Sequence, residues 1–285
     1  MKVVQTIDAV RDEVIAAKQT GLSIGFVPTM GYLHEGHVSL IEAARKDHDF
    51  VVLSIFVNPL QFGPNEDLDR YPRDFQRDEK IAQKADVDVI FYPSVHEMYP
   101  TNMPMSIHVT SGVDVLCGAS RPGHFDGVAT VVMKLLQIVQ PNEAYFGQKD
   151  AQQLAIIMNM VEAFNVPVNI RGCPTVREED GLAKSSRNVY LTKEERAEAP
   201  FLYEALKAGA NLVRSGETSH SFIRAELEKR LETGSGRIDY VDILHYPSLE
   251  QSEQLSGKVI LAVAYFYKNA RLIDNYIVDI QEGEK

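Results

Sequence analysis

The sequence predicts an α/β protein with a mostly parallel, doubly wound sheet and a second, smaller α+β domain. Strand-like and helix-like segments alternate through the N-terminal part, which is typical of parallel strands joined by helices on both faces of the sheet. After Arg171 the pattern changes to polar turn residues, then helices, then alternating strands. We therefore expect domains at residues 1–175 and 176–285, with the boundary between Gly172 and Thr192.

The elements of the first domain follow from the spacing of apolar residues. A helix that ends at Gly21 comes first. The buried strand, the second helix and the β-branched strand that follow it form one right-handed βαβ unit. The same alternation then continues along the chain. The expected helices cover 10–18, 38–46, 73–85, 128–139 and 150–164, and the expected strands cover 22–27, 50–57, 87–92, 143–146 and 166–171.

The second domain begins with a helix-start signal. Thr192 and Glu195 form a capping-box pattern, which predicts a helix that runs toward Ser215. Two helices followed by sheet segments indicate a small α+β fold. The second helix is expected over 219–232, and the strands over 238–244, 258–267 and 271–279.

Composition argues against several classes of protein. A chain of 285 residues can bury a large core, and its net charge of −11 argues against a general nucleic-acid surface but allows a local basic pocket. Two isolated cysteines, Cys117 and Cys173, indicate neither a disulfide framework nor a zinc site. Residues 1–10 do not resemble a signal peptide, and no apolar run is long enough to span a bilayer. We expect a cytoplasmic protein with no membrane or nucleic-acid partner.

The segment 28–37, Pro-Thr-Met-Gly-Tyr-Leu-His-Glu-Gly-His, carries most of the functional information. It lies between an expected strand and an expected helix, where ligands bind in doubly wound sheets. Gly31 and Gly36 allow the backbone to approach a ligand closely, and a helix start offers unpaired N–H groups to a phosphate. His34 and His37 share one face of a helical turn, so both imidazoles could donate hydrogen bonds to phosphate oxygens.

Other interpretations of this segment stay open at the level of its residues. The two histidines could bind a metal, although their spacing differs from the zinc-protease motif His-Glu-x-x-His. They could also be surface side chains at a helix start, and the glycines could be ordinary turn residues. The sequence contains no glycine-rich loop that ends in Gly-Lys-Ser or Gly-Lys-Thr.

Two further segments carry cations that suit a phosphate-rich ligand. Lys149, in segment 146–150, lies between a short strand and a helix, and Gln153 follows one helical turn later. Segment 181–188 combines hydroxyl groups with Arg187, which can bind phosphate oxygens with two parallel hydrogen bonds. The alternative explanation for the first segment is an exposed lysine followed by an aspartate N-cap. The alternative for the second segment is a solvated linker.

Two more loops offer neutral or basic donors. Asn58 and Gln61 follow the second strand of the βαβ unit, although an Asn-Pro sequence also favours a simple turn. Arg121 and His124 lie in a loop before an expected helix. Each loop is a weak signal alone, and together they predict a phosphate-rich ligand without naming the acid that reacts.

In this order, the segments resemble the pantoate–β-alanine ligase (pantothenate synthetase) family over nearly the whole chain. The motif His34-x-Gly36-His37 alone is similar to the wider nucleotidyltransferase superfamily, which includes class I aminoacyl-tRNA synthetases. The resemblance is carried by PTMGYLHEGH at 28–37, FVNPLQF at 56–62, RPGHFDGV at 121–128, FGQKD at 146–150 and GLAKSSRN at 181–188.

The resemblance implies a Rossmann-like N-terminal domain, a homodimer and an ATP-dependent reaction in two steps. Pantoate and ATP give pantoyl adenylate and pyrophosphate, with Mg²⁺ bound mainly through the phosphates of ATP. The amine of β-alanine then attacks the adenylate and releases AMP and pantothenate. The smaller domain is expected to close over the adenylate, which is prone to hydrolysis.

The resemblance also implies roles for individual residues. The expected catalytic residues are His37, which has the acid role, His34 and Lys149. ATP is assigned to Met30, Gly31, Tyr32, Leu33, His34, Glu35, Gly36, His37, Gly147, Gln148, Lys149, Asp150, Val176, Lys184, Ser185, Ser186 and Arg187. Pantoate is assigned to Gln61 and Gln153, with Gln61 also near β-alanine, and the other candidate substrate-binding residues are Pro28, Thr29, Asn58, Arg121 and His124.

Three rival functions make different demands on the protein. A relative of class I aminoacyl-tRNA synthetases would need a tRNA-binding surface. The acidic net charge of the chain argues against such a surface. A nucleotidyltransferase with a dinucleotide product would release pyrophosphate but no AMP. A non-catalytic regulator would bind ATP without turnover.

Overall fold

The computed structural model describes residues 1–63, 66 and 68–280, which fold into two compact units. Unit 1 comprises Met1–Thr110, Arg121–Gln148 and Ile156–Pro174, and unit 2 comprises Ser111–Ser120, Lys149–Ala155 and Thr175–Lys285. The units therefore differ from the continuous domains expected at 1–175 and 176–285. Two short segments of the expected first domain, Ser111–Ser120 and Lys149–Ala155, belong to unit 2 because they contact its residues. For example, the Cys117 Sγ lies 3.4 Å from the Tyr240 hydroxyl.

The described strands of unit 1 form one parallel sheet of six strands in the order β1-β4-β3-β2-β5-β6. From β2, the chain builds β3 and β4 on one side, and β5 and β6 on the other. The loops after β2 and β5 therefore open at the carboxyl edge where the strand order reverses, which is where such sheets bind ligands. The strands are β1 (Lys2–Val4), β2 (Ile24–Thr29), β3 (Phe50–Ile55), β4 (Val89–Phe91), β5 (Glu143–Gly147) and β6 (Asn169–Cys173).

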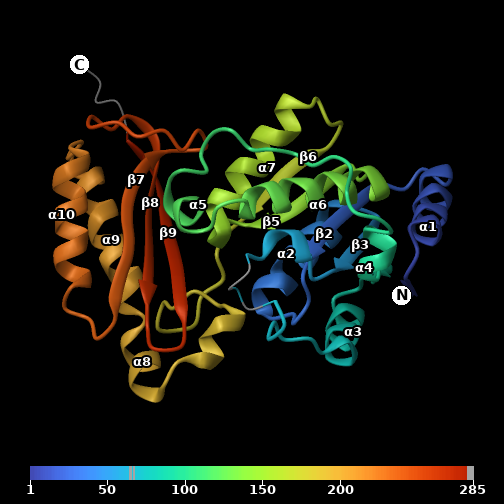
Figure 1. Ribbon diagram of the computed structural model, residues 1–285, viewed down its shortest axis with the longest axis horizontal. Helices are drawn as coiled ribbons and strands as arrows, with labels where there is room; N and C mark the ends of the chain where they lie inside the picture. The colour runs from blue at the N-terminus through green and yellow to red at the C-terminus, as the bar shows by residue number, and fades with distance from the viewer. Residues whose placement is uncertain (64–65, 67, 281–285) are drawn as a thin grey trace. The chain divides into compact units, whose positions relative to one another are not determined.

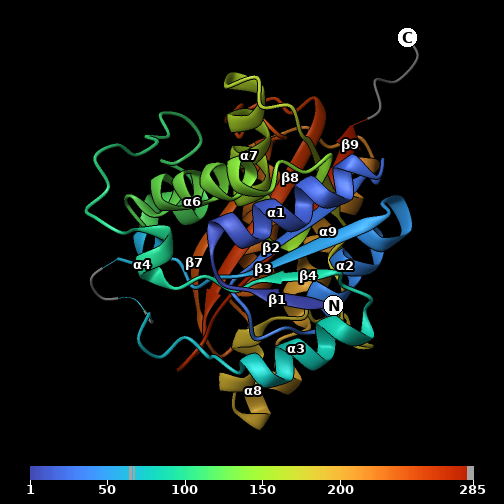
Figure 2. The same ribbon diagram turned by 90° about the vertical axis from the view of Figure 1, so that its right-hand side faces the viewer.

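Helices cover both faces of this sheet, as its continuous apolar strands require. Helices α1 and α6 contact each other and β2, and α1 runs across the strands in Figure 2. Helices α2 and α3 share a core with Val27, Leu53 and Ile90 on the other face. No described helix is long and apolar enough to cross a membrane. The helices are α1 (Ile7–Gln19), α2 (Glu35–Asp47), α3 (Phe75–Lys84), α4 (Val95–Met98), α6 (His124–Val139) and α7 (Ala151–Ala163), which begins in unit 2.

Unit 2 is built on an antiparallel sheet in the order β7-β8-β9. Helices α9 and α10 lie along this sheet in Figure 1, and they bury Leu206 and Leu227 against Val241 and Val263. The elements are α5 (Leu116–Ser120), α8 (Lys193–Glu198), α9 (Phe201–Arg214), α10 (His220–Leu231), β7 (Arg237–His245), β8 (Gly257–Phe266) and β9 (Arg271–Ile280). The α/β sheet with a smaller α+β part is the fold class that the sequence predicts.

One expected helix is divided in two, and another, α6, begins at His124, four residues before its expected start, so His124 is not in a loop. Three short strands or α-helices were not expected. The helix expected from Thr192 to Ser215 is two helices, because Pro200 lies between α8 and α9 and has no N–H to continue the hydrogen-bond ladder. The Thr192–Glu195 capping box is confirmed at the start of α8. Strand β1 and helices α4 and α5 are too short to give a periodic pattern in the sequence.

Shortening a core side chain of unit 2 should destabilise the protein strongly. Leu227 of α10 is fully buried in the core of unit 2. We expect Leu227→Ala to lower the free energy of unfolding by about 2–5 kcal/mol, because the lost contacts leave a cavity. Urea unfolding followed by circular dichroism measures this change. Lys229→Ala, at an exposed position of α10, should stay within about 0.5 kcal/mol of the unsubstituted chain, and equal losses would contradict the assigned core.

Candidate active site

The turn between β2 and α2 is held in an uncommon backbone conformation. Gly31 has φ 83° and Tyr32 has φ 52°, both in the left-handed region. The Thr29 hydroxyl donates to the carbonyl oxygen of Ser54 at 2.8 Å and accepts the N–H of Gly31 at 3.1 Å. A Cβ at Gly31 would lie only 2.9 Å from Ile55 Cγ2, so both conformation and space require glycine there.

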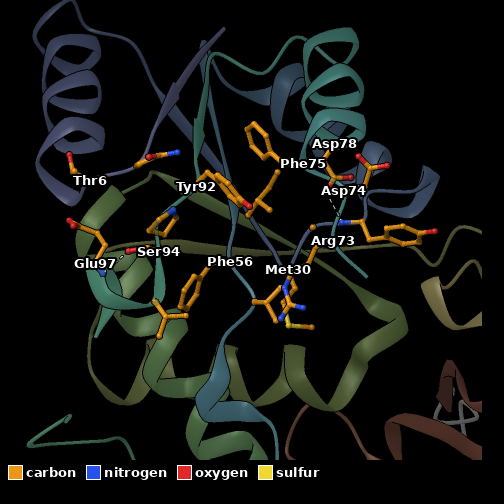
Figure 3. A pocket seen from close by; sticks show the side chains of 17 residues that line it. Thr6, Met30, Phe56, Arg73, Asp74, Phe75, Asp78, Tyr92, Ser94 and Glu97 are labelled. Atoms are coloured by element: carbon orange, nitrogen blue, oxygen red, sulfur yellow. Dashed lines mark hydrogen bonds between the residues drawn. The ribbon is translucent and has the colours of Figure 1, made fainter. Parts of the chain in front are cut away.

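A buried carboxylate from another helix fixes the same turn. Asp78 of α3 is only 1% exposed, and its two oxygens accept the N–H groups of Tyr32 and Leu33 at 2.7 Å each. Figure 3 shows Asp78 directed toward this turn. Burial raises the pKa of Asp78, although the two N–H donors act in the opposite direction. The side chain of Leu33 is fully buried, so the turn is anchored immediately before His34.

The two histidines form the first turn of α2. His34 is the N-cap residue, and its Nδ1 accepts the N–H of Gly36 at 3.1 Å. The Nδ1 of His37 accepts the N–H of His34 at 3.3 Å, so the two imidazoles form a capping box. Their ring centroids are 4.1 Å apart. Because each Nδ1 is an acceptor, each neutral ring carries its proton on Nε2, which makes Nε2–H the donor of both side chains.

Asn58 orients the side chain of Gln61. Gln61 ends the short helix η1 (Pro59–Gln61), and Asn58, which is 1% exposed, donates from Nδ2 to its Oε1 at 3.2 Å. The same Nδ2 donates to the Gly127 carbonyl at 3.1 Å, and the Asn58 Oδ1 accepts the Tyr99 hydroxyl at 2.8 Å. The polar atoms of Asn58 are thus bonded within the protein, and this leaves Asn58 as an orienting residue.

A second chain of contacts supports Gln61 from its backbone. The Gln61 Nε2 lies 3.2 Å from the Met30 Sδ, and the Gln61 carbonyl lies 2.7 Å from the His124 Nδ1. Arg121 lies 2.9 Å from the His124 Nε2, and because arginine can only donate, His124 carries its proton on Nδ1. Arg121 also forms an ion pair with Glu66. Burial raises the pKa of Glu66, but Arg121 outweighs it and holds this pKa below its usual value.

The segment after β5 passes from unit 1 into unit 2. In unit 1, β5 pairs with β2 and ends at Gly147. Gln148 therefore follows at the same edge as residues 30–37, which lead from β2 into the first turn of α2 and are called the histidine turn. In unit 2, the Lys149 Nζ lies 3.8 Å from the Asp150 carboxylate. The carbonyl oxygen of Lys149 accepts a hydrogen bond from the Asn275 Nδ2 at 2.9 Å.

The candidate phosphate-binding segment of unit 2 follows a small hairpin. The N–H of Lys184 donates to the carbonyl oxygen of Val176 at 2.9 Å, and Arg177 pairs with Ala183 as an isolated antiparallel bridge. The Lys184 ammonium lies 3.3 Å from the Glu178 carboxylate, which partly neutralises its charge.

Four polar residues, Ser185 to Asn188, follow this hairpin. The Ser185 hydroxyl accepts the N–H of Arg187 at 3.3 Å and caps the short helix η3 (Ser186–Tyr190). The Asn188 Nδ2 donates to the Ala183 carbonyl at 3.0 Å, which ties the helix back to the hairpin. The structure thus presents Ser185, Ser186 and Arg187 on one capped turn.

A cavity of about 450 Å³ lies next to the histidine turn within unit 1. Met30, Gly31 and Tyr32 form part of its wall, and Figure 3 shows the side chains that surround it. The rings of Phe75 and Tyr92 stack there with centroids 4.3 Å apart. Sequence analysis missed this cavity, because its walls come from the ends of several strands and share no motif. Its other polar and aromatic side chains are Gln5, Thr6, Phe56, Arg73, Asp74, Asp78, Ser94 and Glu97.

The structure brings together most of the predicted residues of unit 1 at one sheet edge. Pro28 and Thr29 end β2, and Met30 contacts Gln61. Sequence analysis missed Asp78, because a single carboxylate in an amphipathic helix carries no signal of a partner more than forty residues away. The candidate residues of unit 2 are Lys149, Asp150, Gln153, Val176 and Lys184–Arg187.

Comparison with known proteins decides the family. The family model for pantoate-beta-alanine ligase matches residues 2–277, nearly the whole chain. The chain belongs to the pantoate-beta-alanine ligase family. It is therefore an enzyme, and the family that the sequence motifs resemble is confirmed.

Relatives and solved structures agree with this family. A pantothenate synthetase from Halalkalibacterium halodurans is 58% identical over 283 residues, which cover 99% of this chain and 100% of the relative. The crystal structure of pantothenate synthetase from Thermus thermophilus is 46% identical, with a TM-score of 0.89. The match covers 97% of this chain and 99% of that structure. A pantoate-beta-alanine ligase from Francisella tularensis, complexed with beta-gamma ATP and beta-alanine, is 36% identical with a TM-score of 0.78 and 97% coverage of both chains.

Adding one methyl group at Gly31 should disturb the histidine turn. Gly31→Ala combines left-handed strain, about 1–2 kcal/mol, with close contacts to Ile55 and Asp78. Gly21 has the same φ of 83° but no atom within 4 Å, so Gly21→Ala measures the strain alone. We expect Gly31→Ala to lower the melting temperature more than Gly21→Ala and to reduce ligase activity, which Gly21→Ala should preserve. Equal effects of the two substitutions would show that the contacts at Gly31 do not matter.

Replacing the Asp78 carboxylate should loosen the same turn. An amide at Asp78→Asn keeps one acceptor but turns an NH₂ group toward a backbone N–H, so one of the two hydrogen bonds is lost. We expect a loss of about 1–3 kcal/mol in unfolding free energy together with reduced activity. Asp74→Asn is the control, because it removes an exposed carboxylate from the N-cap of the same helix, where asparagine is equally favoured. Its stability and activity should stay unchanged.

Proposed function

We propose that the chain catalyses the ATP-dependent condensation of pantoate with β-alanine, giving pantothenate, AMP and pyrophosphate through a pantoyl adenylate. The observation that carries this proposal is the pair of imidazoles at the start of α2, whose Nδ1 atoms cap the helix and whose Nε2–H groups are the donors. Family membership supplies the substrates, since the relatives are named for pantothenate formation and one solved neighbour is described with an ATP compound and beta-alanine.

The first step joins two anions, so the site must supply positive charge. A carboxylate oxygen of pantoate attacks the α-phosphorus of ATP, and the bond from that phosphorus to the pyrophosphate oxygen breaks. His34 and His37 are suited to donate hydrogen bonds to the phosphate oxygens on which charge develops. Lys149 and Arg187 are assigned to the remaining phosphates, with Ser185 and Ser186 as neutral donors. His37 keeps its proposed acid role in the form of a strong hydrogen bond, which its Nε2–H donates to the developing negative charge.

The remaining contacts assigned to ATP are distributed along both units. They are Met30–Leu33, Glu35, Gly36, Gly147, Gln148, Asp150, Val176 and Lys184. Lys184 is the weakest of these as a phosphate ligand, because its ammonium already lies beside Glu178.

The second step replaces the phosphate leaving group with an amine. The unprotonated amine of β-alanine attacks the carbonyl carbon of the adenylate, the bond to the AMP oxygen breaks, and the nitrogen loses a proton. Gln61 is suited to bind pantoate near this carbon, because Asn58 fixes which end of its amide is the donor. Gln153 is assigned to pantoate as well, and Pro28 and Thr29 are assigned to its pocket.

Arg121 and His124 support this step through Gln61 in the proposed scheme. His124 donates to the backbone carbonyl of Gln61 and in turn accepts from Arg121, so both fix the backbone from which the Gln61 side chain extends. This makes them, with Asn58, positioning residues in the proposal, although the sequence places all three among the substrate-binding candidates.

The proposed metal is Mg²⁺ carried on the phosphates of ATP. Among the described residues, no group of three or more His, Cys, Asp or Glu side chains is arranged to hold a metal ion. The donors assigned to the phosphates are cationic or neutral, a set that suits an ion bound mainly by phosphate oxygens. When bound, Mg²⁺ would shield the phosphate charge. A homodimer stays a prediction from the resemblance, and a cytoplasmic location stays a prediction from the sequence pattern.

Product analysis tests the proposed reaction. Purified protein is incubated with ATP, Mg²⁺, pantoate and β-alanine, and each acid is also omitted in turn. We expect stoichiometric AMP, pyrophosphate and pantothenate only with the complete mixture. Continued release of pyrophosphate without AMP from the complete mixture would instead support a nucleotidyltransferase, and ATP binding without any product would support a regulator.

Removing the His37 imidazole should slow the reaction without unfolding the protein. We expect His37→Ala to lower kcat about 10²–10³-fold, which is typical when one donor to a developing oxyanion is lost. The control is His96→Ala, at an exposed position of α4, which should keep full activity. Circular dichroism confirms folding of both variants, and an unchanged kcat in His37→Ala would remove His37 from the proposed machinery.

A further inference from the structure

Strand β9 holds both of the unit 2 segments that are assigned to phosphate. Its neighbouring residues Asp274 and Asn275 are 5% and 8% exposed, and neither belongs to any motif singled out in the sequence. Adjacent residues of a strand point to opposite faces of the sheet. The two side chains therefore reach different partners from one point of the strand.

On one face, Asp274 anchors the hairpin that precedes the Ser185–Arg187 turn. Its two oxygens accept from both terminal nitrogens of Arg177, at 2.7 and 2.9 Å. The Arg177 guanidinium also donates to the Gly181 carbonyl at 3.1 Å and lies 3.5 Å from the ring centroid of Tyr203. A bidentate pair that also stacks on an aromatic ring allows few other orientations. The hairpin is thus fixed to β9.

On the other face, Asn275 anchors the backbone of Lys149. The Asn275 Nδ2 donates to the Lys149 carbonyl oxygen at 2.9 Å. The backbone N–H of Asn275 donates to the Asp274 Oδ1 at 2.8 Å, so the two anchors are linked to each other. A shift of β9 or of either side chain would therefore change the separation between Lys149 and the Ser185–Arg187 turn.

We propose that Asp274 and Asn275 are positioning residues that set the spacing of these two segments for the pyrophosphate end of ATP. The proposal rests on the proposed function, which assigns Lys149, Ser185, Ser186 and Arg187 to the phosphates. Neither residue touches the substrate in this scheme. Both act through the backbone or the side chain of a neighbour.

This role separates the two chemical steps. The first step needs the pyrophosphate group of ATP to be held in line with the attacking carboxylate. The second step uses pantoyl adenylate, from which pyrophosphate has already departed. Loss of the β9 anchors should therefore impair adenylate formation and spare the attack of β-alanine on a supplied adenylate. A general loss of structure would impair both steps.

The test compares Asn275→Ala and Asp274→Asn with Asp279→Asn, an exposed carboxylate on the same strand. Steady-state AMP formation gives kcat/KM for ATP, and a single-turnover reaction with synthetic pantoyl adenylate and β-alanine gives the rate of the second step. We expect both anchor variants to lose about tenfold to a hundredfold in kcat/KM for ATP. Their second-step rate should stay within about twofold, and Asp279→Asn should match the unsubstituted protein in both steps.

The outcomes separate this inference from the proposed function. If the unsubstituted protein and Asp279→Asn form no AMP, the proposed reaction is wrong and the inference falls with it. If they are active and Asn275→Ala keeps its kcat/KM for ATP, only the inference is overturned. An equal fall in both steps also overturns it. Asn275→Ala decides the matter alone if Asp274→Asn fails to fold, because it leaves the buried ion pair intact.

Discussion

The conformation of the histidine turn in unit 1 depends on the two hydrogen bonds that the Asp78 carboxylate accepts. Strand β2 must end and helix α2 must begin within a few residues, and the connecting turn contains two consecutive left-handed residues. Its N–H groups cannot pair within a strand or a helix. Asp78, which lies on helix α3, accepts two of these N–H groups. Because the Asp78 carboxylate and its partners lie away from water, leaving the N–H groups unpaired would cost about 1–3 kcal/mol each.

The position of the two imidazoles follows from this turn. A helix N-terminus leaves N–H groups without intrahelical partners, and His34 and His37 satisfy two of them through Nδ1. The same hydrogen bonds select the tautomer, so the helix cap that stabilises α2 also determines that Nε2 is the donor. The same two rings therefore serve both needs, the helix cap through Nδ1 and the chemistry through Nε2.

Gln61 shows a similar dependence on its neighbours. An amide can present either of its ends to a ligand, and its orientation is set only by what surrounds it. Asn58 occupies the oxygen of Gln61, while His124 fixes its backbone. Gly127 completes this site, because a Cβ there would lie 2.3 Å from the Leu60 carbonyl and would push η1 away from α6. The glycine in the segment 121–128 thus has a packing role.

Periodicity along the chain was enough to predict the parallel sheet, the helices that flank it and the antiparallel strands of unit 2, because these patterns are local. The order of the segments from residue 28 to residue 188 was enough to identify the family. Only the tertiary structure showed the contacts made by Asp78, Asp274 and Asn275, and that Asn58 and His124 contact Gln61. It also showed that Ser111–Ser120 and Lys149–Ala155 fold with the C-terminal sheet. Each of these depends on contacts between residues far apart in the chain, and such contacts leave no spacing that a single sequence can reveal.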